Sequence, residues 1–128
     1  MSRKRKIFLF VVAMLTVCTV KINAQIYHDE CKEDLRAFAR QEINYESLGL
    51  TVDDTLSWYQ NENWVSKVAI ISNYNRIVWS EFDSKMRIDS IRWNFLALEG
   101  KFKLRSPVLR YLNLYVNRLS ELDVSYNT

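Results

Sequence analysis

The sequence has few of the residues from which small catalytic sites are most often built. Its 128 residues include two glycines, one proline, two cysteines and one histidine. Two glycines cannot form a glycine-rich phosphate-binding loop, and no cysteine pair, serine elbow or acidic calcium loop is present. His28 stands in HDEC (28–31), where successive residues of a helix point in different directions, whereas zinc ligands come in spaced pairs. We therefore predict no enzymatic activity, no catalytic or metal-binding residue and no cofactor.

The first 24 residues have the pattern of a secretory signal peptide. Basic residues in MSRKRK precede the apolar run IFLFVVAMLTVCTV (7–20), which is too short to cross a bilayer as a helix, and Ala24 is a small residue at the expected cleavage point. A lipoprotein signal at Cys18 and an uncleaved membrane anchor stay open as alternatives. We predict a secreted protein that is extracellular or lies at the cell surface or outer membrane, with contact to membrane only through this signal.

The predicted signal peptide also carries the excess of positive charge. The whole chain has 18 basic and 15 acidic residues, but five of the basic ones and no acidic one precede Gln25. The remainder has 13 basic and 15 acidic residues, a net charge of −2. Nucleic-acid-binding domains usually have a basic surface, so we predict no nucleic-acid partner. Cys31 is then the one remaining cysteine, predicted to be a buried thiol near the first helix, with a reactive or intermolecular thiol as the alternative.

Residues 25–86 have the pattern of a mixed unit of helix, loop and two short strands. HDECKEDLRAFARQEINYES predicts a helix over about 29–46, capped by Asp29. Its apolar face at helical spacing consists of Leu35, Phe38, Ala39 and Ile43. The following TVDDTLSWYQNENW (51–64) is typical of a polar loop. Alternating β-branched residues predict strands over 64–72 and 76–82, which the SNYN turn would join as a hairpin.

A regular spacing of apolar residues begins at Arg87. One segment matches the template L-x-x-L-x-L-x-x-N-x-L at every position, with Leu109, Leu112, Leu114, Asn117 and Leu119. Related positions are Ile91 and Trp93 upstream and Leu122, Val124 and Asn127 downstream. In this pattern the leucines point inward from a short strand. Asn117 is expected to turn inward as well, where its amide can satisfy backbone groups at the following bend.

This segment resembles the leucine-rich repeats of secreted and surface proteins of bacteria, including internalin-like short repeats. LSELDVSYNT (119–128) is similar to their phrase L-x-x-L-D-V-S-x-N-T, and residues 79–102 resemble the junction between an N-terminal cap and a first repeat. The resemblance implies an α/β repeat solenoid, in which leucine-rich repeat coils (87–128) are stacked on a helix-plus-strand N-terminal cap (25–86). It also implies that the chain is an N-terminal fragment with an open end.

The resemblance further implies a non-enzymatic protein–protein recognition or adhesion module. If the leucines of the template point inward, the residues between them form an exposed strand face. The predicted partner-binding residues on that face are Tyr111, Asn113, Tyr115, Arg92 and Asn94. The expected partner is a protein or a surface glycan.

Several alternatives stay open at this point. Tyr111 and Tyr115 could simply cover neighbouring coils. The chain could be the targeting arm of an enzyme whose catalytic domain lies beyond residue 128, or a truncated stand-alone secreted protein without activity. The basic residues Lys101, Lys103 and Arg105, just before Pro107, are interpreted as a solvated loop.

Overall fold

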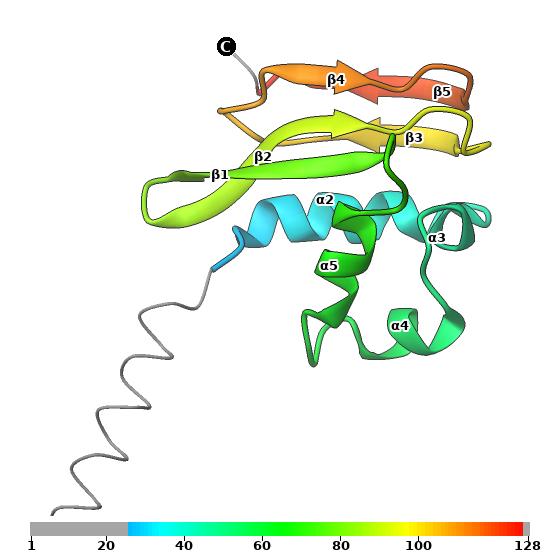
Figure 1. Ribbon diagram of the computed structural model, residues 1–128, viewed down its shortest axis with the longest axis horizontal. Helices are drawn as coiled ribbons and strands as arrows, with labels where there is room; N and C mark the ends of the chain where they lie inside the picture. The colour runs from blue at the N-terminus through cyan, green and yellow to red at the C-terminus, as the bar shows by residue number, and fades with distance from the viewer. Residues whose placement is uncertain (1–25, 127–128) are drawn as a thin grey trace, which may run out of the picture.

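The computed structural model describes residues 26–126, so the predicted signal peptide and Asn127 lie outside the described residues. The described part contains helices α2 (Asp29–Ala39), α3 (Asn44–Ser47), α4 (Val52–Ser57) and α5 (Asn63–Ala69), then strands β1 (Arg76–Phe82), β2 (Lys85–Arg92), β3 (Glu99–Lys103), β4 (Tyr111–Asn113) and β5 (Arg118–Asp123). The helices lie at one end of the molecule and β4 and β5 at the other (Figure 1). Within residues 26–126, no helix has the length and apolar character needed to span a membrane.

Helix α2 contributes the helical side of the core. Leu35, Phe38 and Ala39 are buried along one of its faces, as their spacing predicts. The N-cap is His28 rather than Asp29, because the His28 Nδ1 accepts the backbone N–H of Glu30 at 3.1 Å. Asp29 is instead the first helical residue, a position where the helix dipole favours a carboxylate.

The single helix predicted over about 29–46 is two helices. The backbone of Glu42 is left-handed, with φ of 50°, and an L-residue in that conformation does not continue a right-handed helix. The chain therefore changes direction between α2 and α3. Ile43, which was expected on the buried face, is 62 % exposed as a result.

The segment predicted as a polar loop contains helix α4. Thr51 and Asp54 form a capping box, in which each side chain accepts a hydrogen bond from the other residue's backbone N–H. Lys67 of α5 then donates to the Asp54 carboxylate at 2.8 Å. The Lys67 ammonium is the main reason that the pKa of Asp54 lies below its ordinary value.

The strand predicted over 64–72 is wrong, because residues 63–69 form helix α5. Trp64, Val65 and Val68 bury one side of this helix, and their spacing suits a helix as well as a strand. The β preference of valine and isoleucine is weak, and burial against the core overrides it. The predicted hairpin through SNYN is also wrong, since a single isolated bridge joins Ile70 to Arg76.

The strand predicted over 76–82 is present as β1 with those bounds, but its antiparallel partner is β2. Asp83 and Ser84 form the two-residue connection, and both have positive φ, 55° and 66°. Such a turn suits the right-handed twist of a tight hairpin. Ile77 and Ile91 lie opposite each other on the buried face of this hairpin.

The remaining strands pair in parallel, β2 with β4 and β3 with β5. The other edge of β3 is covered by amide side chains from the helical region. Gln41 accepts the N–H of Lys101 at 2.7 Å and donates to its carbonyl at 2.6 Å. Asn44 makes the same pair of bonds with Glu99, at 2.9 and 2.7 Å. These bonds satisfy backbone groups of an edge strand that would otherwise lack partners.

The predicted repeat solenoid is wrong. Residues 26–126 form a small mixed α/β fold with short helices and two small sheets, one of three strands in the order β1-β2-β4 and one of two strands, β3 and β5. In a solenoid each coil stacks on similar neighbours. Here the neighbours of β2 and β3 on the helical side are an antiparallel hairpin strand and the side chains of Gln41 and Asn44. The segment from Arg87 onward therefore adds strands to these sheets and does not form a series of stacked coils.

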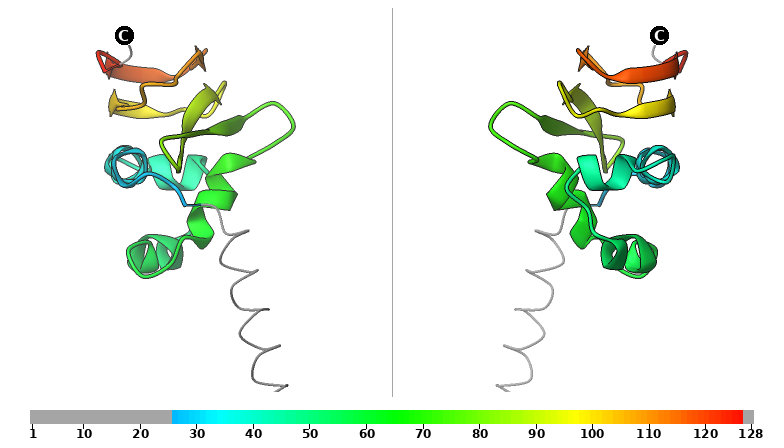
Figure 2. Two further views of the ribbon diagram at one scale, coloured as in Figure 1. Left: turned by 90° about the vertical axis from the view of Figure 1, so that its left-hand side faces the viewer. Right: turned by 90° about the vertical axis from the view of Figure 1, so that its right-hand side faces the viewer.

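The core lies where the helices meet the strands (Figure 2). Trp93, at the end of β2, is fully buried, and its ring lies 5.9 Å from that of Phe38 and 5.5 Å from that of Phe102. These contacts join α2, β2 and β3 around one aromatic cluster. Aromatic residues bury the largest area per side chain, so this cluster contributes strongly to the hydrophobic stabilisation.

The residues predicted to point inward are buried to different degrees. Ile91 and Trp93 are completely buried. Five others are half-buried against the core: Leu109, Leu112, Leu114, Leu119 and Val124. Leu122 departs from the prediction, since it is 46 % exposed. The gradient follows from position, because β4 and β5 lie at the end of the molecule away from the helices (Figure 1).

Candidate partner-binding face

The side chain of Asn117 organises the bends that follow β2 and β4. Its amide nitrogen donates to the carbonyls of Trp93 and Leu114 at 2.6 and 3.0 Å. Its amide oxygen accepts the N–H groups of Leu96 and Leu98 at 3.2 and 3.1 Å. Asn117 thus turns inward, as its place in the sequence pattern suggests, and satisfies four backbone groups. It connects the end of β4 to the segment between β2 and β3.

A pair of asparagines, Asn75 and Asn94, organises the same end of the three-stranded sheet. The Asn94 N–H donates to the Asn75 side chain at 2.7 Å, and the Asn75 amide donates back to the Asn94 carbonyl at 3.2 Å. The side-chain oxygen of Asn94 accepts the N–H of Tyr115 at 2.9 Å. Asn94 was predicted to contact a partner, but this oxygen is used within the fold to position Tyr115.

The outer face of the three-stranded sheet carries two rows of side chains across its strands. Successive residues of a strand point to opposite faces, and Ile77, Ile91 and Leu112 point toward the core. Register then places the first row on the outside as Arg76, Arg92 and Asn113, and the second row as Val78, Ser90 and Tyr111. Together with the aromatic residues just beyond the strand ends, Tyr74, Phe95 and Tyr115, we call these nine residues the arginine–aromatic face.

Arg76 and Arg92 dominate the electrostatics of this face. They lie directly opposite each other on β1 and β2, and both are exposed. None of the nine residues of the face is acidic, and neither arginine forms an ion pair with another described residue. Like charges directly opposite each other on paired strands destabilise a sheet. The two guanidinium groups therefore present unneutralised positive charge to solvent.

The predicted residues Tyr111, Asn113, Tyr115 and Arg92 all lie on this face. Tyr111 is 48 % exposed and Tyr115 is 66 % exposed. Asn113 lies between the two tyrosines, since its amide donates to the Tyr111 hydroxyl at 3.1 Å and its side-chain oxygen accepts the Tyr115 N–H at 3.1 Å. The Tyr111 hydroxyl is left able to donate its own proton to an acceptor.

An apolar hollow adjoins the row of arginines. It encloses about 420 Å³ and is lined by Ser72, Tyr74, Asn75, Asn94 and Phe95. Phe95 is held outward by a left-handed backbone, with φ of 57°, and its ring meets that of Tyr115 edge to face at 5.7 Å. A bulky residue in this conformation is strained and needs the surrounding hydrogen bonds to stay there.

Sequence reasoning missed Arg76, Tyr74 and Phe95. Arg76 opens the strand RIVWSEF, and alternation alone would have placed it on the same side as Val78 and away from Ile77. Its closeness to Arg92 depends on the pairing of β1 with β2, which was predicted with the wrong segment. Tyr74 and Phe95 lie in bends, where no simple periodicity indicates which way a side chain points.

The exposed face of the two-stranded sheet has a different charge arrangement. Lys101 lies 3.6 Å from Glu121, and Arg118 lies 3.5 Å from Glu99, in both cases across the β3–β5 pair. Lys103 lies over the ring of Tyr126 at 5.4 Å. The interpretation of the run from 101 to 105 as a solvated loop is wrong for these lysines, which belong to β3.

Arg105, the third member of that basic run, is fixed to helix α2. Its guanidinium donates to the Asp34 carboxylate at 2.8 and 3.0 Å, and its backbone N–H donates to the same group at 2.7 Å. Asp34 is 6 % exposed. A buried carboxylate needs such partners, so this pair holds the connection after β3 against the helix.

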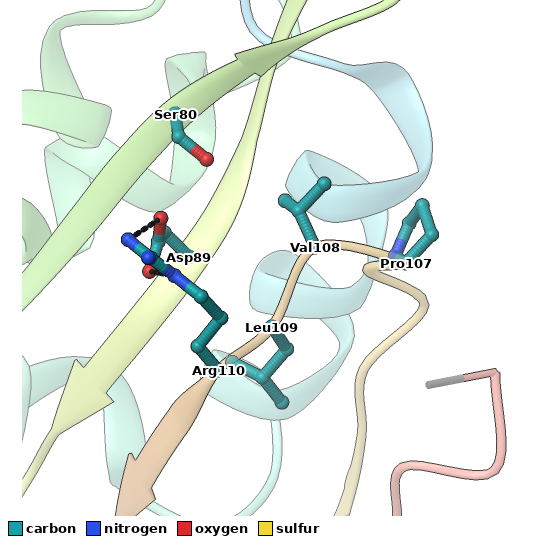
Figure 3. Close-up of a pocket in the computed structure, with 6 residues that line it drawn as sticks. All are labelled: Ser80, Asp89, Pro107, Val108, Leu109 and Arg110. Atoms are coloured by element: carbon teal, nitrogen blue, oxygen red, sulfur yellow. Dashed lines mark hydrogen bonds and ion pairs between the residues drawn. The ribbon is translucent and has the colours of Figure 1, made fainter. Parts of the chain in front are cut away.

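Asp89 is the one acidic residue of β2, and it is paired with Arg110. The guanidinium donates to both carboxylate oxygens, at 3.0 and 2.8 Å, as Figure 3 shows. The Arg110 guanidinium is the main reason that the pKa of Asp89 lies below its ordinary value. An open hollow of about 440 Å³ beside this pair is lined by Ser80, Asp89, Pro107, Val108, Leu109 and Arg110. An ionised, paired carboxylate is poorly suited to exchange protons with a substrate at neutral pH.

Cys31 is completely buried in α2, and its burial raises the pKa of the thiol. A protonated, enclosed thiol is a poor nucleophile.

Among residues 26–126, no group of three or more His, Cys, Asp and Glu side chains could hold a metal ion. Comparison with protein-family models, curated proteins and solved structures finds no match to this chain.

Proposed function

We propose that this protein is a non-enzymatic recognition module that binds a partner through the arginine–aromatic face. The observation that carries the proposal is the gathering of exposed tyrosine, phenylalanine and arginine side chains on one side of a three-stranded sheet. Tyrosine and arginine are enriched among the residues that dominate binding energy at protein interfaces. A sheet also holds such side chains at fixed spacing, which reduces the entropy lost on binding.

The surrounding hydrogen bonds support this reading, because they position the exposed rings. Asn94 and Asn113 both accept the N–H of Tyr115, and Asn113 donates to the Tyr111 hydroxyl. The Phe95 ring adds an edge-to-face contact with Tyr115. Rings held in this way can contact a partner without first being ordered, which favours affinity.

The test is selection of random short peptides displayed on phage, with the purified full chain as the target. Peptides that bind the wild type are then measured on the double variant Tyr111→Ala, Tyr115→Ala. We expect their affinity to fall by at least about tenfold, the effect of removing one or two dominant interface residues.

The matched control is Tyr126→Ala, which removes a tyrosine of similar exposure, 54 %, that follows β5 and packs against Lys103 of the other sheet. This variant should bind the selected peptides like the wild type. All variants are first compared by circular dichroism and thermal unfolding. Full-strength binding by a folded Tyr111→Ala, Tyr115→Ala variant would show that the face is not the binding site.

We further propose that the likeness to leucine-rich repeat proteins of bacterial surfaces reflects a shared local device, and that the protein acts outside the cell. Support for the first point is limited to the bend held by Asn117, whose amide bonds four backbone groups. Support for the second is the signal pattern in residues 1–24. Expression of the full chain in bacteria, with N-terminal sequencing of the exported product, tests the cleavage at Ala24.

A further inference from the structure

We propose that the arginine–aromatic face binds an acidic segment of a partner protein, with carboxylates on Arg76 and Arg92 and an apolar side chain in the adjoining hollow. The inference rests on the proposed function and adds the chemistry of the partner. It follows from three features: the unneutralised charge of the face, the apolar character of the adjoining hollow, and the backbone hydrogen bonds that already use part of the capacity of the amide oxygens there.

The charge of the face is complementary to a pair of carboxylates. Arg76 and Arg92 are opposite each other, exposed and without an acidic neighbour among the nine residues of the face. Each guanidinium is a planar fork that fits a carboxylate with two parallel hydrogen bonds. A partner that brings two acidic side chains would remove the repulsion between the arginines and gain two charge-assisted contacts.

The hollow beside the arginines selects for an apolar group. Tyr74 and Phe95, its largest lining residues, are 75 % and 71 % exposed. Burying such aromatic surface under an apolar side chain is favourable in proportion to the area removed from water. An acidic segment that also contains an apolar residue would therefore contact both parts of the face together.

The amide groups in the hollow favour a peptide over a sugar. The Asn75 side chain bonds both the backbone N–H and the backbone carbonyl of Asn94, and the Asn94 side-chain oxygen accepts the Tyr115 N–H. Each of these two side-chain oxygens already accepts one backbone N–H, so each has only one lone pair left for a sugar hydroxyl. Polar groups that are desolvated without partners oppose binding. An apolar side chain has no such requirement.

The experiment uses the peptides selected on the full chain, followed by synthesis of the strongest binders. We expect them to combine aspartate or glutamate with an apolar residue. Each peptide is paired with a version in which Asn and Gln replace Asp and Glu, and binding is measured by fluorescence anisotropy at about 0.05 M and about 0.5 M salt. The acidic peptides should bind at least about tenfold more tightly than their neutral versions, and salt should weaken them.

The matched protein variants reverse charge on one sheet at a time. The double variant Arg76→Glu, Arg92→Glu should lose about tenfold or more in affinity for the acidic peptides. The double variant Lys101→Glu, Arg118→Glu reverses two basic residues of the other sheet and should bind normally. The single variants Arg76→Glu and Arg92→Glu place opposite charges across the strands, so each should fold and still bind more weakly than the wild type.

The outcomes separate this inference from the proposed function. Peptides that need Tyr111 and Tyr115 but lack acidic residues, and that bind the Arg76→Glu, Arg92→Glu variant normally, would overturn the inference alone. Peptides that need neither the tyrosines nor the arginines would overturn both. If a heparin-derived oligosaccharide binds through the arginines while acidic peptides do not, the face belongs to an acidic glycan and the peptide assignment is wrong.

Discussion

The two sheets of this protein differ in how their charged side chains are arranged. The strands of the three-stranded sheet contain four basic residues, Arg76, Lys85, Arg87 and Arg92, and two acidic ones, Glu81 and Asp89. The strands of the two-stranded sheet contain three basic and three acidic residues. On the second sheet, opposite charges are cross-strand neighbours. On the three-stranded sheet, Arg76 lies opposite Arg92, and Asp89 forms an ion pair with Arg110.

This difference affects how freely the charged side chains can bind a partner more than it affects the stability of the fold. Exposed ion pairs such as Lys101–Glu121 typically contribute well under about 1 kcal/mol, so pairing them stabilises the fold only slightly. The pairing does, however, neutralise the electric field of these side chains, so that little of that field remains to attract a charged partner. The unpaired arginines keep their field at the surface, where it can steer and hold an acidic group. We therefore propose the arginine–aromatic face, and not the exposed face of the two-stranded sheet, as the binding surface.

The largest expected effect comes from Asn117, which links the two sheets. Asn117→Ala removes four hydrogen bonds to backbone groups of Trp93, Leu96, Leu98 and Leu114. Leaving such groups without partners should lower the free energy of unfolding by about 3 kcal/mol. Urea denaturation followed by tryptophan fluorescence measures the loss. The exposed Asn73 is the control, and an equal loss in Asn73→Ala would contradict the special role of Asn117.

The next effect should differ between the two sheets, because the Asn44 side chain hydrogen-bonds to β3 of the two-stranded sheet and to α2. Asn44→Ala removes the bonds to Glu99 and to the Phe38 carbonyl and should lower the free energy of unfolding by about 2 kcal/mol. Gln41→Ala, whose bonds to Lys101 are exposed, should cost less. Hydrogen exchange should show faster exchange in β3 and β5 than in β1 and β2. Uniform loss of protection would indicate that the sheets unfold as one unit.

The ion pair of Asp89 predicts a pH dependence. The pKa of Asp89 is lowered in the folded protein by Arg110, so the folded state binds the proton less readily than the unfolded state. The contribution is therefore complete above the ordinary aspartate pKa of about 3.8 and is lost as the pH falls through the lowered pKa. Denaturation midpoints across the acid range should fall less steeply for Asp89→Asn than for the wild type. Equal slopes would show that this pair has no share in acid stability.

The smallest effects should have opposite signs on the two sheets. Arg92→Glu places a carboxylate opposite Arg76 and should raise the free energy of unfolding by about 0.2–1 kcal/mol. Lys101→Glu places a carboxylate opposite Glu121 and should lower it by a similar or smaller amount. Both changes alter the charge equally, so net charge cannot explain a difference in sign. Denaturation at low and high salt measures both effects, which salt should reduce. A loss of stability in Arg92→Glu would remove the contrast between the faces.

Several local features could be predicted from sequence alone. The bounds of β1, the buried side of α2 and the inward turn of Asn117 follow from patterns within about a dozen residues. The grouping of Tyr111, Asn113 and Arg92 depended on two patterns: the alternation of side chains along a strand, and an offset of 21 residues between corresponding strand positions. The β2–β4 register reproduces this offset. The segment at 64–72 was misassigned, because Trp64, Val65 and Val68 suit both a strand and a helix. The solenoid was wrong because local likeness does not specify what each strand pairs with.

The sequence by itself determined which residues are apolar, which alternate and where an asparagine can close a bend, since these properties depend on neighbours along the chain. Only the tertiary structure decided which distant residues became neighbours. It places Arg76 opposite Arg92 and pairs Asp89 with Arg110. It also brings Tyr74 and Phe95 together as the lining of one hollow. These contacts join segments brought together by the hairpin at Asp83–Ser84 and by the parallel pairing of β4 with β2. Strand register is set by packing between distant segments, and the charge pattern of the arginine–aromatic face follows from it.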